Sequence, residues 1–493
     1  MSTAVTTASV NRPTTSMGIR RILAVNALWL GQGAHWPPIT FSLLPAAALL
    51  VVGYANRSEA TLLVGHVSAA GNLFALLAPI LAGWLSDRTR TRWGRRRPWL
   101  VAGTAVNVAG LAWLALSDSP LTLAVAYMLV QLSFNLAGGA YAAVIPDVVP
   151  AQERGRASGM LGMMNVVGSV VGLAAVIAVL KLLGEGRTGV VVGYACLMVL
   201  LLVTTAITVL AIKEPPVPAT RPEKLNLSAG GVVAITAGTI AAAAWLAYLL
   251  LPLGELFWPV AIGGIAAAVI AVAAAWRVES MRDFFSAFRS HDFFWTFATR
   301  AFVIMGINTI LPFLAFYFGD VIGAKDPSTQ SGLWGLAVLA GAIVPAVVGG
   351  QLSDRFGRRK LVVYISGGLQ AAVASVLLFQ LPQSLPLVYV MGVVFGVGYG
   401  MYYAVDWAIA CDVLPDREKS SGRDMGLWHI AFTLPTALAP ALFAPVLAWL
   451  NQSGHLILGI ETGNHLGYRF VFAGAVFWFL MGTVFIKRLR TVR

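Results

Sequence analysis

Charged residues are scarce in this sequence. Asp, Glu, Lys and Arg make up only 11% of its 493 residues, whereas hydrophobic residues make up 58%. Soluble domains usually carry about 25% charged residues, and the mean hydropathy here is +0.78. This composition excludes a soluble globular fold. It predicts an all-α polytopic membrane protein that lies in the lipid bilayer.

Cysteine is nearly absent, and the motifs of common catalytic sites are missing. Cys196 and Cys411 both lie inside apolar runs, where they suit core packing better than a disulfide bond or a metal site. The chain contains neither H-E-x-x-H nor G-x-x-x-x-G-K-[ST]. The glycines of 396–400 also lie in an apolar run, where glycine more often permits close helix packing than phosphate binding. We therefore expect no enzyme, no metal site and no cofactor.

Acidic residues are fewer than basic ones, 21 against 34, so that the net charge is +13. In a soluble protein this excess would suggest a nucleic-acid partner. In a polytopic membrane protein it instead marks the cytoplasmic loops. We therefore expect no nucleic-acid partner.

The sequence is rich in apolar runs of roughly 20 residues, the length that spans a bilayer. Six runs precede a polar, proline-containing linker at 213–224, and six lie in the last two-fifths of the chain. Two more, at 229–251 and 257–276, are joined by a short turn and predict an inserted hairpin of two helices. The other twelve are near 22–52, 62–85, 99–116, 121–145, 158–183, 189–212, 293–318, 333–352, 361–381, 387–411, 425–450 and 468–485. The prediction is a fold of two six-helix bundles plus this hairpin, with fourteen transmembrane helices.

These runs divide the chain into five parts. The hairpin (about 229–276) lies in a central linker, together with an amphipathic helix that we expect at the cytoplasmic surface. The parts are a cytoplasmic tail (1–19), an N-terminal six-helix bundle (20–212), the central linker (213–292), a C-terminal six-helix bundle (293–486) and a second cytoplasmic tail (487–493).

The basic residues are divided unevenly between the two sides of the predicted bundles. If both termini are cytoplasmic, Arg300 is the only basic residue within a span. The other basic residues lie on the cytoplasmic side, except for five on the outer side. The outer side receives Arg57, Lys181, Arg187, Lys325 and Arg469. Because positive loops remain inside, we expect a multi-pass protein of the cell membrane with both termini cytoplasmic.

Two polar loops are repeated in the two halves of the chain. Residues 83–99 hold six arginines and one aspartate, Asp87, and a shorter version at 350–360 holds Asp354. A second pattern, D-V-x-P-x-x-E-[RK] followed by G-R-x-x-G, begins at Asp147 and again at Asp412. A six-helix unit that is repeated in the same orientation is typical of one large class of transporters.

The second loop, G-Q-L-S-D-R-F-G-R-R at 350–359, resembles the signature between helices 2 and 3 of the major facilitator superfamily. With the duplicated bundles around it, the resemblance covers most of the chain. It implies two bundles that move about a central substrate path. The first loop has the longer form S-D-R-x-x-x-R-x-G-R-R-R-P. That form resembles the glycoside–pentoside–hexuronide cation symporters and the related sucrose–proton symporters.

The resemblance implies a gating role for these loops. In the superfamily the loop aspartate caps the start of a helix in the opposite bundle, so that Asp87 would face the helix near 422–426 and Asp354 the one near 155–159. The alternative is that the arginines only fix the topology. The predicted gating residues are Asp87, Arg88, Arg95, Arg96, Asp354, Arg355, Arg358, Arg359, Glu153, Arg156, Glu418 and Arg423.

In the superfamily plan, helices 1, 4, 7 and 10 line the substrate path. Polar side chains within spans are costly and therefore mark candidate sites, although amides also bridge helices by hydrogen bonds. Amides together with aromatic rings suit a neutral, polyhydroxylated ligand. The predicted substrate-binding residues are Gln32, His35, Trp36, Gln131, Asn135, Asn308, Tyr402, Tyr403 and Trp407.

Arg300 and Asp406 are the strongly charged pair that lies well inside the spans. Asp406 precedes Asp412, at the edge of its helix, by about 9 Å of helix axis, and Arg300 lies similarly far from the start of its own helix. We predict that the two meet as an intramembrane ion pair whose carboxylate binds and releases the coupling proton. The alternative is a purely structural pair.

One departure from the symporter pattern concerns the coupling ion. Sucrose–proton symporters carry an acidic residue in helix 4 at the position of Gln131, which does not titrate. Coupling then rests on Asp406, uses sodium, or is absent. The predicted function is cation-coupled, most simply proton-coupled, symport of a sugar or glycoside by a monomer. The main alternative is a proton-coupled exporter of drugs or other amphipathic small molecules.

Overall fold

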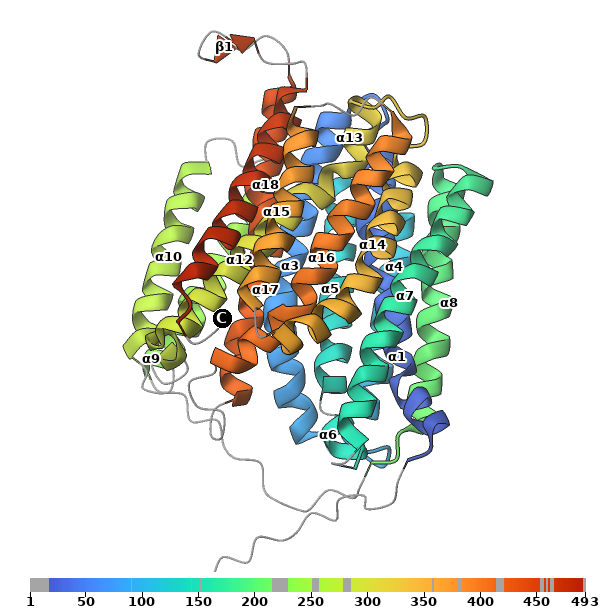
Figure 1. The fold of residues 1–493 in the computed structure, drawn as a ribbon, viewed down its shortest axis with the longest axis vertical. Helices are drawn as coiled ribbons and strands as arrows, with labels where there is room; N and C mark the ends of the chain where they lie inside the picture. Colours follow the sequence, from blue (N-terminus) through green and yellow to red (C-terminus); the bar gives the residue numbers. More distant parts are fainter. Residues whose placement is uncertain are drawn as a thin grey trace, which may run out of the picture.

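The structure, a computed structural model, is almost entirely helical (Figure 1). Helices are the expected element, because a backbone in hydrocarbon has to satisfy its own hydrogen bonds. The structure describes residues 17–89, 91–142, 144–150, 153–214, 229–250, 257–277, 285–356, 359–379, 384–413, 421–452, 456–457, 460–461 and 465–490.

The N-terminal half is a bundle of long helices, coloured blue to green in Figure 1. Its elements are α1 (Ile19–Pro38), the π-helical turn η1 (Ile39–Leu43), α2 (Leu44–Val52), α3 (Arg57–Arg88), α4 (Arg97–Leu116), α5 (Pro120–Ala142), α6 (Val144–Val148), α7 (Arg154–Leu183) and α8 (Arg187–Ala211).

The C-terminal half is a second bundle, coloured yellow to red. Its helices are η4 (Phe285–Arg289), α12 (His291–Ile310), η5 (Leu311–Phe313), α13 (Leu314–Asp320), α14 (Pro327–Phe356), α15 (Arg359–Leu378), α16 (Leu385–Val413), α17 (Ser421–Asn451), α18 (Leu466–Phe485) and η6 (Ile486–Arg488). Between α17 and α18, β1 (Leu456–Ile457) and β2 (Ile460–Glu461) pair antiparallel.

The two ends of the molecule differ in charge. We call the lower end in Figure 1, which carries α6 and the connection between α3 and α4, the arginine-rich end. The upper end carries α13 and the connections at 53–56, 184–186 and 321–326, and we call it the opposite end.

Two helices, α9 (Ala229–Leu250) and α10 (Phe257–Arg277), lie where the sequence predicts the hairpin, at the side of the C-terminal half in Figure 1. Trp245 and Leu246 of α9 pack on Ala69 of α3 and on Ala441 of α17. In the described part of the chain, eleven helices are long and apolar enough to cross a membrane, and α3, α9 and α10 are not among them. The molecule is therefore a multi-pass membrane protein, whereas the count of fourteen spans and the domain boundaries stay predictions.

The first span contains Pro37 and Pro38 within its helix. The structure continues the helix through both prolines into the π-helical turn η1 and then α2. Proline lacks an N–H group, so that Pro37 leaves the carbonyl of Gly33 without its helical donor. The hydroxyl of Ser169 on α7 donates to that carbonyl at 3.1 Å, as expected where neighbouring helices replace a lost backbone bond.

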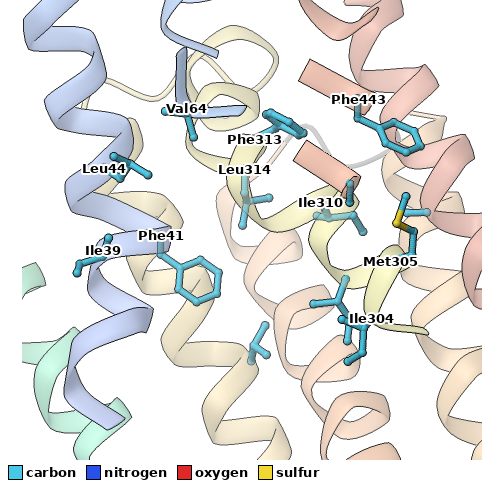
Figure 2. Packing of buried hydrophobic residues seen from close by; sticks show 14 of the residues in the cluster. Ile39, Phe41, Leu44, Val64, Ile304, Met305, Ile310, Phe313, Leu314 and Phe443 are labelled. Atoms are coloured by element: carbon cyan, nitrogen blue, oxygen red, sulfur yellow. The ribbon is translucent and has the colours of Figure 1, made fainter. Parts of the chain in front are cut away.

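One large hydrophobic core joins the two halves. It contains Phe41 and Val64 from the N-terminal half and Phe313 and Phe443 from the C-terminal half, and Figure 2 shows these side chains together. A second cluster, around Tyr141, lies entirely within the N-terminal half near the arginine-rich end. The large core is therefore shared by the two halves, whereas the second cluster belongs to one of them.

Candidate functional site

Arg300 and Asp406 lie side by side inside the C-terminal half. Nη1 of Arg300, on α12, is 3.1 Å from Oδ2 of Asp406, on α16. The two residues are 5% and 6% exposed. The hydroxyl of Tyr402, one turn before Asp406, donates to its Oδ1 at 3.0 Å. The structure thus brings together the two charged residues that the sequence places at one depth.

The guanidinium of Arg300 has hydrogen-bonding capacity that these contacts do not use. Its Cζ lies 3.2 Å from the centroid of the Trp428 ring on α17, which is a cation–π contact. Although Nη1 is within ion-pair distance of Asp406, neither Nε nor Nη1 has a hydrogen-bond acceptor among the described residues. A buried donor without an acceptor costs about 1–3 kcal/mol. An oxygen atom of a bound ligand would satisfy these donors.

A chain of amides connects the two halves. Nδ2 of Asn135 donates to the main-chain oxygen of Gln131 at 2.8 Å, and Nε2 of Gln131 donates to Oδ1 of Asn72 at 2.8 Å. Nδ2 of Asn72, on α3, then donates to the main-chain oxygen of Thr436 on α17 at 2.9 Å. The sequence prediction omits Asn72, because its span is not one of the four lining helices. The feature of the sequence that indicates Asn72 is an amide side chain within an apolar run.

The predicted residues of the first span point into the N-terminal half. His35 is 1% exposed, and its Nε2 lies 3.2 Å from Oδ1 of Asn107 on α4. The rings of His35 and Trp36 both pack on Phe134, with centroids 4.8 and 5.1 Å apart. Gln32 is buried as well, and a Cβ at Gly138 would lie 3.7 Å from its Nε2.

The predicted residues of the C-terminal half are grouped around α16. The ring of Tyr403 lies 4.5 Å from that of Tyr399 and 5.9 Å from that of Tyr402. On α12, Nδ2 of Asn308 donates to the main-chain oxygen of Ile304, within its own helix. The side chain of Trp407 lies outside the described part.

The first arginine-rich loop is held within its own half. Nη2 of Arg95 donates to Oδ1 of Asp147 at 2.6 Å, and Nε of Arg96 donates to Oδ2 at 3.1 Å. The carboxylate of Glu214 accepts from the main-chain N–H groups of residues 95, 96 and 97, at 2.6 to 3.1 Å. It therefore caps the start of α4, where backbone donors lack helical partners.

The second loop repeats part of this arrangement, because Arg359 forms an ion pair with Asp412. Asp147 and Asp412 both begin the repeated D-V-x-P pattern, so that each half pairs its loop with its own pattern. Glu153 accepts from the main-chain N–H of Met17 at 2.8 Å, and Arg156 is exposed. The remaining predicted gating side chains lie outside the described part: Asp87, Arg88, Asp354, Arg355, Arg358, Glu418 and Arg423.

Polar contacts between the halves gather at the opposite end. Nη1 of Arg57, at the start of α3, is 3.0 Å from Oδ1 of Asp320 at the end of α13. The hydroxyl of Tyr468 donates to the other oxygen of Asp320 at 2.6 Å. The hydroxyl of Ser42 donates to the main-chain oxygen of Ser328 at 2.9 Å. None of these residues is among the predicted site residues, and the contacts of Arg57 and Ser42 join the two halves at this end of the molecule.

Two similar helical halves with a polar seam and a buried charge pair define the architecture of a secondary transporter. The family model of the Major Facilitator Superfamily matches residues 40–440, which is well over half of the chain. The chain belongs to this superfamily.

A known relative agrees with this assignment. An uncharacterized symporter of Synechocystis sp. (strain ATCC 27184 / PCC 6803 / Kazusa) is 29% identical over 171 residues, which cover 32% of this chain. The matched segment spans only 31% of the relative's length. The specific symporter branch that the first loop resembles therefore stays a prediction.

Three solved structures share the fold. An auto-inhibited POT family peptide transporter has a TM-score of 0.65 and 16% identity, covering 96% of this chain and 97% of the other. The nucleoside transporter NupG has a TM-score of 0.60 and 13% identity, with 95% and 100% covered. A bacterial homologue of the human lysosomal transporter Spinster, inward-facing and unoccupied, has a TM-score of 0.61 and 16% identity, with 96% and 98% covered. At these identities the likeness shows the fold alone.

Proposed function

We propose that this protein is a secondary active transporter of the cell membrane that carries a sugar or glycoside together with a cation, most simply a proton. The observation that carries the proposal is the buried pair of Arg300 and Asp406, with Tyr402 and Trp428 around it. Charged side chains inside a membrane bundle are costly and are retained chiefly where they serve transport. Family membership and the similarity to a symporter support the same function.

Proton coupling follows from the charge balance of the pair. While Asp406 is ionised it neutralises Arg300, and removing one partner of a buried pair leaves an uncompensated charge. When Asp406 takes up a proton, the guanidinium of Arg300 is released to donate to an oxygen atom of the substrate. The substrate and the proton would therefore bind together. Gln131 cannot perform this step, because an amide does not titrate.

The side chains around the pair favour a neutral ligand that carries hydroxyl groups. Hydroxyl oxygens of a sugar accept hydrogen bonds from a guanidinium and from amides, and aromatic rings such as those of Tyr402 and Tyr403 are suited to pack against a sugar ring. Asp87 and Asp354 keep their proposed role as gates at the arginine-rich end, where each would cap a helix of the opposite half.

The experiment is uptake of a panel of labelled disaccharides into proteoliposomes, with a proton gradient, a sodium gradient or neither. We expect accumulation that follows the proton gradient and is lost in Asp406→Asn. Glu59→Gln, an exposed carboxylate at the opposite end, is the matched control and should transport normally. Proton-driven accumulation by Asp406→Asn would contradict the coupling role. If amphipathic dyes were expelled and no sugar were accumulated, the substrate class would be wrong.

A further inference from the structure

Glu185 lies in the short connection between α7 and α8, at the opposite end of the N-terminal half. Its carboxylate accepts hydrogen bonds from the main-chain N–H groups of Ser328, at 3.2 Å, and Thr329, at 2.5 Å. Both belong to the first turn of α14, in the other half of the molecule. The first N–H groups of a helix have no partner within the helix, and a carboxylate there is also favoured by the helix dipole. Glu185 thus caps α14 from across the seam.

The helix that Glu185 caps is packed unusually closely against the N-terminal half. Ser328 also receives the hydrogen bond from Ser42. A Cβ atom at Gly332, one turn further along α14, would lie only 2.6 Å from the hydroxyl of Ser42. A Cβ at Gly335 would lie 2.8 Å from the ring of Phe41. This face of α14 is therefore a surface of close contact between the halves, and its first turn is where Glu185 holds it.

We propose that Glu185 is a latch that holds the opposite end closed by capping α14 of the other half, and that it releases this helix when the substrate path opens toward that end. The latch rests on the alternating movement of the two halves that the proposed function requires. It does not depend on the identity of the substrate or of the coupling ion. With Asp87 and Asp354 as proposed gates, carboxylates that cap helices of the opposite half would then act at both ends.

The latch should depend on pH, because the environment of the Glu185 carboxyl differs between the closed and the open state. Burial raises the pKa of Glu185 in the closed structure, although the hydrogen bonds from Ser328 and Thr329 oppose this shift. In an open state the carboxyl is in water and its pKa returns toward the ordinary value. The closed state therefore binds the proton more tightly, and acid favours closure. A proton taken up at Glu185 accompanies closing, and it leaves on opening.

The groups around Glu185 do not change this sign. The hydroxyl of Tyr54 donates to the main-chain oxygen of Glu185 at 2.9 Å, and burial together with the charge of Glu185 raises the pKa of Tyr54. The guanidinium of Arg187 donates to the carbonyl of Ser117 at 2.7 Å. Asp326 accepts from Nε2 of Gln330. In the described part of the chain, neither Arg187 nor Lys325 forms an ion pair with Glu185.

The test is labelling of a buried reporter from outside. Ser331→Cys, at a fully buried position in the same stretch of α14, is introduced after Cys196 and Cys411 are replaced by Ser. A membrane-impermeant maleimide then reports opening of this end. We expect Glu185→Ala to raise the labelling rate about fivefold or more, the lower range of a conformational coupling energy. Glu59→Ala, which removes an exposed carboxylate at the same end, should leave the rate unchanged.

Glu185→Gln separates the latch from its titration. The amide oxygen still accepts from the two N–H groups, so that labelling should remain slow. The rate is expressed relative to that of an exposed cysteine at the same pH, because the thiolate is the reacting form. This relative rate should no longer vary between pH 5 and pH 8. An unchanged labelling rate in Glu185→Ala would overturn the latch. If Glu185→Ala does not fold, as judged by gel filtration, Glu185→Asp carries the test, and an unchanged rate in Glu185→Asp would then be the contradicting result. Failure of sugar uptake would bear on the proposed substrate and leave this result intact.

Discussion

At the scale of single residues, the buried pair of Arg300 and Asp406 affects the stability of the protein and its transport activity in different ways. Both side chains are buried, and each charge is balanced by the other at 3.1 Å. Replacing a buried ion pair with apolar residues is often neutral for stability, whereas removing one partner costs about 3–5 kcal/mol. Stability and transport can therefore be separated by mutation.

We predict that Arg300→Leu alone destabilises the protein by about 3 kcal/mol, because Asp406 is left buried without its partner. The double variant Arg300→Leu, Asp406→Leu should recover most of the thermal stability, measured by unfolding in detergent, but no substrate uptake. Recovery of uptake in the double variant would show that the pair is only structural.

The two loop pairs differ in exposure, and their contributions should differ accordingly. The side chains of Arg96 and Asp147 are 4% and 16% exposed, whereas those of Arg359 and Asp412 are 20% and 40% exposed. We predict that Asp147→Asn costs about 1.5–3 kcal/mol, as for hydrogen bonds to charged groups. Asp412→Asn should cost less than about 1 kcal/mol, as for surface pairs. Equal losses of melting temperature would contradict this ranking.

The sequence could predict some of these residues and not others, for a physical reason. Arg300 and Asp406 were found because charge within a span is costly wherever it points. Asn72 and Glu185 are not among the predicted residues, and their partners across the seam are main-chain groups of residues 436, 328 and 329. Every residue has such groups, so that a side chain's main-chain partner leaves no trace in the sequence. The contact of His35 with Asn107 joins two side chains, and it depends on how α1 and α4 pack together, which the sequence does not indicate.

At the scale of the helices, close packing depends on glycine. A Cβ atom at Gly396 on α16 would lie 2.1 Å from the main-chain oxygen of Val338 on α14. One at Gly400 would lie 2.3 Å from that of Ala342. These glycines allow the two backbones to meet, which is the packing role expected from the sequence for the run 396–400.

Gly396→Val should therefore disturb the contact between α14 and α16. Overpacking of a tight interface costs about 1–3 kcal/mol, and we expect a corresponding fall in melting temperature. Gly368→Val on α15 is the matched control, because a Cβ there has nothing within 4 Å. A loss of the same size in both variants would indicate a general effect of valine on these helices.

The helices themselves were predictable, because runs of apolar residues and the loops between them mark their ends. The predicted span near 361–381 corresponds to α15, and the one near 189–212 to α8. The π-helical turn after Pro38 was not predictable. Whether a proline breaks a span depends on whether a neighbouring helix offers a donor, as Ser169 does here.

At the scale of the whole molecule, the repeat predicted the two halves, but not which end would be closed. In each half an aspartate forms an ion pair with an arginine of the loop, Asp147 in one half and Asp412 in the other. The contacts between the halves, such as that of Arg57 with Asp320, involve residues far apart in the chain. A repeated motif reports the structure of each half, whereas the closed end depends on how the halves are placed.

The difference in basic residues between the two ends predicts the orientation of the molecule in the membrane. The opposite end carries few basic residues, whereas the arginine-rich end carries six within residues 83–99, and the side with the excess of Lys and Arg remains in the cytoplasm. Asn56 and Thr91 are exposed at the two ends. In intact cells, with Cys196 and Cys411 replaced by Ser, an impermeant maleimide should label Asn56→Cys at once. Thr91→Cys should be labelled only after the membrane is permeabilised. The reverse pattern would place the arginine-rich loops outside, where Asp87 and Asp354 would meet the outer solution and Glu185 the cytoplasm. The gates and the latch would then exchange sides, and acid in the cytoplasm, instead of acid outside, would favour closure at Glu185.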